Sequence, residues 1–224
     1  MILRLLSLTS LSFLAALFTS CGNSGSGLAV IPKHSISGNP SPARVAVSYK
    51  KEKFDTPACS SNAIAAAAGK PRDKHSMPVY AFSDRNRIVR TTAYTCTECD
   101  HLIYGNKNAA GTLLRYTDHV RSAAADWSFY PVGTTFRIKG LPFLYVVDDY
   151  GSALTGTGTV DLYKPSKVVM NQWGRRNVEI TIVQWGSFKR SAQILAGRTK
   201  FAHCRQMLSN IVRQRPDLGS LASR

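Results

Sequence analysis

Alternating apolar and polar positions dominate the second half of the chain. Val178, Ile180 and Ile182 alternate with polar residues, which is the pattern of a strand that buries one face. Residues 134–138 alternate in the same way, and residues 90–95 are rich in threonine, which strands favour. Polar stretches that contain glycine separate these segments. The pattern predicts a fold of short strands, although periodicity alone does not distinguish one small β fold from another.

A short helix is predicted between two of these strands. Ser166 follows a proline and has the side chain of a good N-cap, and Gly174 is suited to end a helix. The helix therefore covers about residues 167–173. Its spacing predicts three side chains that face the core, namely Val168, Val169 and Trp173.

The tail, residues 187–224, has a different pattern. Apolar residues recur among arginines and lysines, and residues 202–213 fit an amphipathic helix. Such a helix either packs across the β fold or lies on a membrane surface, and the sequence leaves both alternatives open. In both cases its basic outer face is suited to contact with anionic lipid or glycan.

The first residues predict export. A short positive start precedes an apolar run that is too short to span a bilayer comfortably, so residues 1–20 are predicted to be a signal peptide. Residues 18–22 resemble a bacterial lipobox, with phenylalanine where leucine is expected. Cys21 would then be the lipidated first residue of the mature chain, whereas the alternative is an ordinary cleaved signal with a coincidental cysteine. The predicted location is the bacterial cell envelope, as a membrane-anchored lipoprotein that faces the periplasm.

Two further segments precede the β fold. Residues 21–32 contain the glycine and serine of a flexible tether. Residues 33–89 are predicted to be an irregular N-terminal extension that packs on the β domain. Within the extension, residues 43–49 alternate like a strand, and the alanine-rich residues 63–68 fit either a short helix or a disordered stretch.

Size and charge narrow the choice of partner. The chain has 224 residues, which leaves room for one core of moderate size after the signal and tether are removed. Its net charge of +16 favours an anionic polymer: nucleic acid, anionic lipid, or peptidoglycan with its stem-peptide carboxylates. The predicted export argues against nucleic acid. The expected partners are therefore peptidoglycan strands and, through the lipid on Cys21, the membrane.

Four cysteines remain once Cys21 is assigned to lipid: Cys59, Cys96, Cys99 and Cys204. An even number in an exported chain fits disulfides, for which three pairings exist. Cys96, Cys99 and His101 also fit half of a zinc site, which His203 and Cys204 would complete. Free thiols are the third alternative, and the sequence does not choose among the three.

Two acids frame a glycine-containing connection, residues 152–159. Asp149 precedes it and Asp161 follows it, each next to a strand-like segment. Two carboxylates on a stiff β scaffold suit acid/base work on a sugar or acyl bond. The alternative is that both acids cap turns, because aspartate is common at strand ends.

Five blocks of sequence, in this order and spacing, resemble the three-Asp (3D) domain. That domain occurs in membrane-bound lytic transglycosylase A and in small cell-wall enzymes of the stationary-phase-survival type. Thr92-Ala93-Tyr94 resembles its first strand, so the resemblance covers about residues 90–185. The blocks are residues 124–126, 130–134, 147–151, 160–163 and 173–176.

The resemblance implies a mainly β fold, a small six-stranded double-psi β-barrel with a short inserted helix and a C-terminal helix. The barrel domain would span residues 90–186. The implied activity is that of a peptidoglycan lytic transglycosylase, which cleaves the β-1,4 bond between N-acetylmuramic acid and N-acetylglucosamine and forms a 1,6-anhydro ring. No cofactor and no metal are implied.

The resemblance also assigns roles to individual residues. Asp161 would protonate the glycosidic oxygen and then, as a carboxylate, take the proton of the 6-hydroxyl that closes the ring. Asp149 would position the sugar or stabilise positive charge at the anomeric carbon. Asp126 is the third aspartate, and its place before a turn fits a structural role as well as a substrate-binding one.

Three further residues are expected to line the cleft. Thr92 and Tyr94 would contact the substrate, with ordinary strand packing as the alternative. Tyr163 would also lie in the cleft, and burial beside it, or the charge of Asp149, would raise the pKa of Asp161. One departure from the family pattern is Ser152, which stands where a second glycine is usual.

Two rival functions remain open at this point. A non-catalytic lipoprotein would keep the barrel and hold glycan with its basic surface. A metal-dependent hydrolase would use Cys96, Cys99 and His101. No nucleophile elbow is present, so serine hydrolase chemistry is a remote third.

Overall fold

The computed structural model describes residues 52–98 and 105–221. The chain divides into two compact units, Met1–Ala46 and Val47–Arg224, and every described residue belongs to the second. The predicted signal peptide, Cys21, the tether and the strand at 43–49 lie outside the described residues. Cys99 and His101 also lie outside them, so the structure does not test these predictions.

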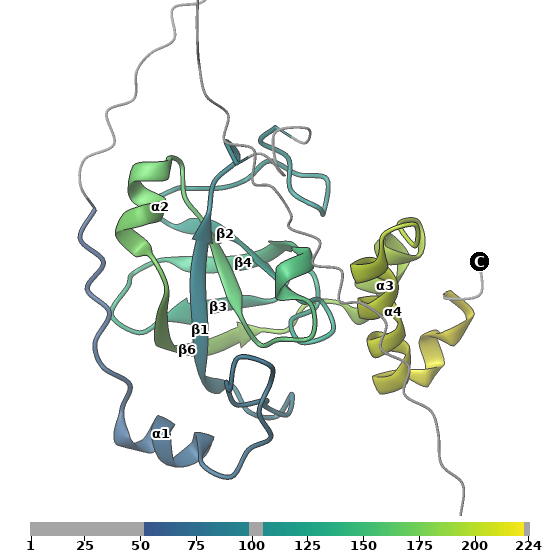
Figure 1. The fold of residues 1–224 in the computed structure, drawn as a ribbon, viewed down its shortest axis with the longest axis horizontal. Helices are drawn as coiled ribbons and strands as arrows, with labels where there is room; N and C mark the ends of the chain where they lie inside the picture. The colour runs from purple at the N-terminus through teal and green to yellow at the C-terminus, as the bar shows by residue number, and fades with distance from the viewer. Residues whose placement is uncertain (1–51, 99–104, 222–224) are drawn as a thin grey trace, which may run out of the picture. The chain divides into compact units, whose positions relative to one another are not determined.

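Six strands in the described part of the chain pair into a closed ring (Figure 1). Their order around the ring is β1-β5-β2-β4-β3-β6, and β6 pairs back onto β1. The pairs β1–β5 and β2–β4 are parallel, and the other four are antiparallel. The mainly β, six-stranded architecture is as predicted. The strands are β1 (Asn86–Tyr94), β2 (Val120–Ala125), β3 (Thr135–Ile138), β4 (Leu144–Asp149), β5 (Val160–Tyr163) and β6 (Arg176–Gln184).

The predicted alternation explains the interior of the ring. Val178, Ile180 and Ile182 on β6 are at most 1% exposed, and Phe136 and Ile138 on β3 are equally buried. Side chains two apart on a strand share one face, so these apolar residues point inward and the residues between them face outward. The outer face of the ring is therefore where polar side chains gather.

Four helices and two short 3₁₀ turns accompany the strands in the described residues. The predicted inserted helix is α2, with the Ser166 side chain accepting from the Val169 amide at 3.4 Å and Gly174 ending it at φ 61°. Val169 and Trp173 are buried as predicted, but Val168 is 62% exposed, so that prediction was wrong. In a helix this short, only one side of each turn meets the barrel. The elements are α1 (Ser61–Ala67), η1 (Ser152–Leu154), α2 (Lys167–Trp173), α3 (Phe188–Ala196), α4 (Ala202–Gln214) and η2 (Pro216–Leu221).

The tail packs on the barrel. The amphipathic helix predicted at 202–213 is α4, which packs with α3 (Figure 1), and its apolar side chains join the barrel core. Polar contacts fix the docking, because the Val132 amide donates to Ser191 Oγ at 2.9 Å and Gln214 Nε2 donates to the Ser128 carbonyl at 3.3 Å. Of the two alternatives, the structure has the packed helix. No helix in the described ranges combines the length and apolar character that crossing a membrane requires.

The described part of the N-terminal extension packs on the barrel. Its alanine-rich stretch forms α1, and the Ser60 side chain that caps this helix also donates to Glu179 of β6 at 2.9 Å. Gly140 lies directly under the extension, where a Cβ would come within 2.4 Å of the Asp55 carbonyl. Strand β1 begins at Asn86, slightly before the predicted domain boundary at residue 90.

Candidate functional site

Four residues lie in one row across the outer face of the barrel. In the strand register, Thr92 of β1 pairs with Asp161 of β5, and Asp161 pairs with Ala124 of β2. On the other edge of β2, Ala124 pairs with Asp149 of β4. Because adjacent strands are about 4.8 Å apart, the two aspartates stand roughly 10 Å apart at their Cα atoms. The small side chain of Ala124, which is buried, lies between them.

Asp161 is partly exposed, and its surroundings raise the pKa of its carboxyl group. The Thr92 hydroxyl donates to its Oδ1 at 2.7 Å. Burial raises the pKa of Asp161 to about 6, the Thr92 hydrogen bond opposes this, and the negative charges of Glu98 and Asp149 add to it. A carboxyl with this pKa is protonated in a large fraction of molecules at mildly acidic pH, whereas an ordinary aspartate is not.

Asp149 is buried and held from several sides. The amides of Ala109 and Tyr150 donate to its Oδ1 at 3.0 and 2.9 Å, and the Tyr94 hydroxyl donates to Oδ2 at 3.1 Å. The indole of Trp127 also donates to its backbone carbonyl at 2.9 Å. These contacts fix the carboxylate in one orientation, and its negative charge raises the pKa of Asp161.

Tyr94 and Tyr163 pack beside the row. They form the register pair two positions further along β1 and β5, which is the next pair on the same face, and their ring centroids are 5.6 Å apart. Both are less than a tenth exposed, and Leu154 of η1 and Ala124 complete this small apolar cluster. Burial and the nearby carboxylates raise the pKa of Tyr94 well above its ordinary value, so its hydroxyl remains a hydrogen-bond donor. The two rings desolvate the base of the site.

Asp126 is not part of this row. It is completely buried, and the amide and hydroxyl of Ser128 both donate to its Oδ1 at 2.7 Å. Its Oδ2 accepts from the Gly156 amide at 2.6 Å, and Gly156 has the positive φ of 77° that favours glycine. Burial raises the pKa of Asp126 despite these hydrogen bonds. Of the two predicted roles, this geometry favours the structural one, which is to hold the loop between Asp149 and Asp161.

Replacing Asp126 with asparagine is expected to destabilise the protein. The Asn side chain keeps an acceptor for Ser128 but places an N–H₂ group against the Gly156 amide, so two donors face each other. The free energy of unfolding should fall by roughly 1–3 kcal/mol, measured by urea denaturation. Asp118→Asn, at an exposed aspartate, is the matched control and should leave stability unchanged. Equal stability of the two variants would contradict the loop-holding role.

The departure at Ser152 does not strain the loop. Gly151 has an extended backbone with φ −144°, and Ser152 begins the 3₁₀ turn η1. Among the described residues other than glycine, only Ser76 has a positive φ. Serine at position 152 therefore adopts its backbone conformation without the freedom of a second glycine.

Two residues near the row were not predicted from the sequence to belong to the site. Asp148 is 4% exposed, accepts from Ser122 Oγ at 2.7 Å, and has a pKa raised by burial to about 6. Its position within the Asp148–Asp149 pair was the available signal, but the pattern did not indicate that both side chains are buried. Arg90, two residues before Thr92 on β1, lowers the pKa of Asp161 through its charge.

Of the three alternatives for the cysteines, the described residues have free thiols, while Cys99 lies outside the described ranges. Cys59, Cys96 and Cys204 carry free thiols. The Cys96 thiol lies 3.6 Å from the Tyr163 hydroxyl, and Cys204 is buried in the core beside α3. In the described part of the chain, no group of three or more His, Cys, Asp or Glu residues is arranged to hold a metal.

The region around the row is similar to a known protein family. Residues 121–184 match the family model of the 3D domain, which confirms the resemblance inferred from the sequence. The match covers β2 to β6, including Asp126, Asp149 and Asp161, while β1 with Thr92 and Tyr94 lies before it. The match is consistent with a function related to the cell wall. Among curated proteins, none matches the chain.

Proposed function

We propose that this protein is a peptidoglycan lytic transglycosylase that uses Asp161 as its acid and then its base. The observation that carries the proposal is the state of Asp161 within the matched 3D domain. Its carboxyl is partly exposed on the outer face of the barrel, and its pKa is raised to about 6. A general acid needs a pKa near the working pH, and burial supplies it here.

The reaction requires two proton transfers at one carboxyl group. Asp161 donates its proton to the glycosidic oxygen between N-acetylmuramic acid and N-acetylglucosamine, and the bond from that oxygen to the anomeric carbon breaks. The resulting carboxylate takes the proton of the muramic acid 6-hydroxyl, whose oxygen bonds to the anomeric carbon. Asp161 ends protonated as it began, and no water is consumed. The fixed negative charge of Asp149 favours the positive charge that develops at that carbon.

The test is the identity of the products. The mature protein is incubated with purified peptidoglycan at pH 5–7, and the released muropeptides are measured by mass spectrometry. Products with 1,6-anhydro ends are expected. Reducing ends alone would make the protein a hydrolase, and absence of products across several substrates would favour the non-catalytic glycan-binding lipoprotein.

The proposal extends to the barrel type and the location. The two parallel pairs, β1–β5 and β2–β4, within an otherwise antiparallel ring support the double-psi topology implied by the family. An experimental structure with a different strand order would overturn it.

The proposed location rests on Cys21 and the preceding apolar run. Lipidation of Cys21 would anchor the protein in the membrane of the envelope, with peptidoglycan within reach of the tether. Cys21→Ser is expected to move the protein from the membrane to the soluble fraction, measured by fractionation and immunoblotting. A variant that stays with the membrane as the parent does would assign the anchor to another contact.

A further inference from the structure

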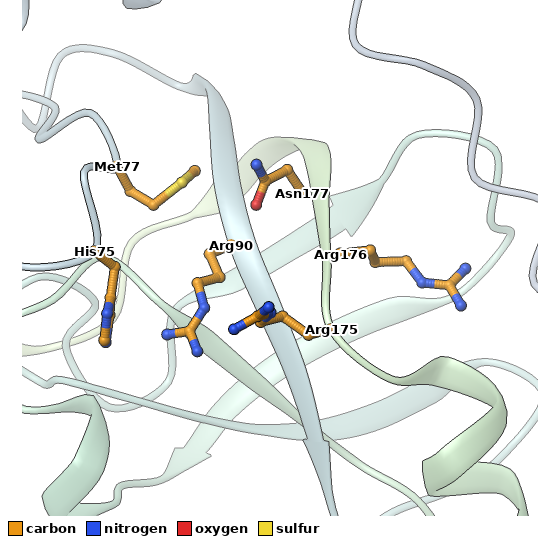
Figure 2. Close-up of a pocket in the computed structure, with 6 residues that line it drawn as sticks. All are labelled: His75, Met77, Arg90, Arg175, Arg176 and Asn177. Atoms are coloured by element: carbon orange, nitrogen blue, oxygen red, sulfur yellow. The ribbon is translucent and has the colours of Figure 1, made fainter.

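A basic cavity lies where the N-terminal extension meets the barrel (Figure 2). Its volume is about 380 Å³, and no acidic side chain lines it. His75 and Met77 come from the extension, whereas the other lining residues come from β1 and from the start of β6 and its approach. The lining residues are His75, Met77, Arg90, Arg175, Arg176 and Asn177.

Two of the three arginines are available to a ligand. The Arg176 side chain donates to the Trp173 and Gln172 carbonyls, and it points away from Arg90 and His75 in Figure 2. The guanidinium groups of Arg90 and Arg175 lie toward the middle of the view. No carboxylate of the described residues forms an ion pair with either of them. The positive charges of Arg90 and Arg175 are therefore not neutralised by a direct ion pair within the described chain.

The cavity adjoins the row that contains Asp161. Arg90 and Thr92 are two apart on β1 and so point to the same face, with Cα atoms about 7 Å apart. Thr92 donates to Asp161, and Arg90 Nη1 donates to Thr159 Oγ1 at 3.4 Å, two residues before Asp161 on the neighbouring strand. A glycan bound over Asp161 would place its nearest substituents at this cavity.

We propose that Arg90 and Arg175 bind a carboxylate of the stem peptide carried by the glycan that Asp161 cleaves. This inference rests on the proposed function. Guanidinium groups bind planar carboxylates through paired N–H donors, and two of them at one cavity select a charged substituent over a neutral one. The extension then has a role in binding, because it supplies the wall of the cavity opposite the barrel.

The experiment measures binding separately from cleavage. A disaccharide tripeptide from peptidoglycan, and the same compound with its carboxyl groups converted to amides, are titrated into the mature protein by isothermal calorimetry. Arg90→Gln and Arg175→Gln are each expected to weaken binding of the carboxylate form roughly fivefold to tenfold. The amide form should bind the parent about as weakly as the carboxylate form binds the variants. Arg190→Gln removes the same charge from an exposed site on α3 and serves as the matched control.

The outcomes separate the anion source and the enzyme activity. Equal binding of the carboxylate and amide forms, or no loss in either arginine variant, would overturn the proposal. Inorganic phosphate is titrated as well. Binding of phosphate at these arginines without binding of the disaccharide tripeptide would also overturn it, by assigning the cavity to a phosphate group. Failure of the cleavage assay with this binding pattern intact would refute the proposed function and leave the carboxylate site standing.

Discussion

Replacing Asp161 with asparagine is expected to abolish detectable cleavage of peptidoglycan. The amide keeps the shape of the side chain and the acceptor for the Thr92 hydroxyl, but it has no proton to transfer. General acid–base catalysis contributes roughly 10²–10⁴-fold, which sets the minimum expected loss in kcat. Release of 1,6-anhydro muropeptides, followed by mass spectrometry over time, measures it. Asp118→Asn, at an exposed aspartate, should retain the parent rate.

Stability should not account for that loss. The pKa of Asp161 is raised on folding, so the folded state holds the proton more tightly, and stability falls as pH rises from about 4 to about 6. Above pH 6 the parent has the cost of a desolvated carboxylate, which the asparagine variant lacks. Thermal melting at pH 7 should therefore place the variant at or above the parent. A variant that melts far lower would point to a structural role for Asp161.

Asp149→Asn should have a different signature. Its Oδ1 can still accept the two backbone amides as an amide oxygen, so the fold should survive. The lost negative charge no longer raises the pKa of Asp161, so less of the acid form is present near neutral pH. The alkaline limb of the pH–rate profile should shift to lower pH, with a smaller loss at pH 5 than at pH 7. Full inactivity of Asp149→Asn beside an active Asp161→Asn would reverse the two assignments.

The second large effect is expected at Lys164, which follows β5. Its side chain is completely buried, and its Nζ has no hydrogen-bond partner among the described residues. Desolvation lowers the pKa of Lys164 to about 7, although the rings of Phe54 and Trp173, 4.1 and 4.6 Å from Nζ, favour the charged form. Lys164→Met removes this buried charge and should raise the free energy of unfolding by roughly 2–4 kcal/mol at pH 6.

The pH dependence distinguishes this effect from better packing. Between pH 7 and about 10.5 the unfolded chain holds the lysine proton and the folded protein releases it, so stability of the parent rises with pH through Lys164. The advantage of Lys164→Met should therefore shrink between pH 6 and pH 9, measured by urea denaturation of both proteins. Other groups cancel in the difference. Lys167→Met, at an exposed lysine on α2, is the matched control. A constant advantage at both pH values would show that the folded protein keeps the Lys164 proton up to pH 9, so that the pKa of Lys164 is not lowered by burial.

Local patterns predicted the elements of this fold well. The alternation at Val178, Ile180 and Ile182 places apolar side chains on one face of β6 whatever its neighbours, and Ser166 can cap a helix without tertiary help. The exposed Val168 shows the limit. An apolar residue within a seven-residue helix is buried only if it lies on the side of the helix that faces the barrel. The spacing of apolar residues alone does not show which side that is.

Local patterns alone did not predict the candidate site, because its residues lie far apart in the sequence. The family resemblance singled out Asp149 and Asp161, and the structure brings them into one row with Thr92, beside Tyr94. The burial of Asp126 and Asp148 could not be predicted from the sequence, because aspartate side chains are normally exposed. The cavity at Arg90 and Arg175 requires the extension to fold back against the barrel, and no short motif encodes such a contact.

The docking of strand β1 determines when the candidate site is assembled. Thr92 and Asp161 are 69 positions apart and meet only because β1 joins β5, while its other edge joins β6 and closes the ring. Closing so long a loop costs entropy that is recovered only when the strands dock. Until then, position 161 carries a hydrated aspartate, which is ionised at neutral pH and cannot donate a proton. A chain that is exported before it folds, under the proposed location, would therefore lack this acid until β1 joins β5.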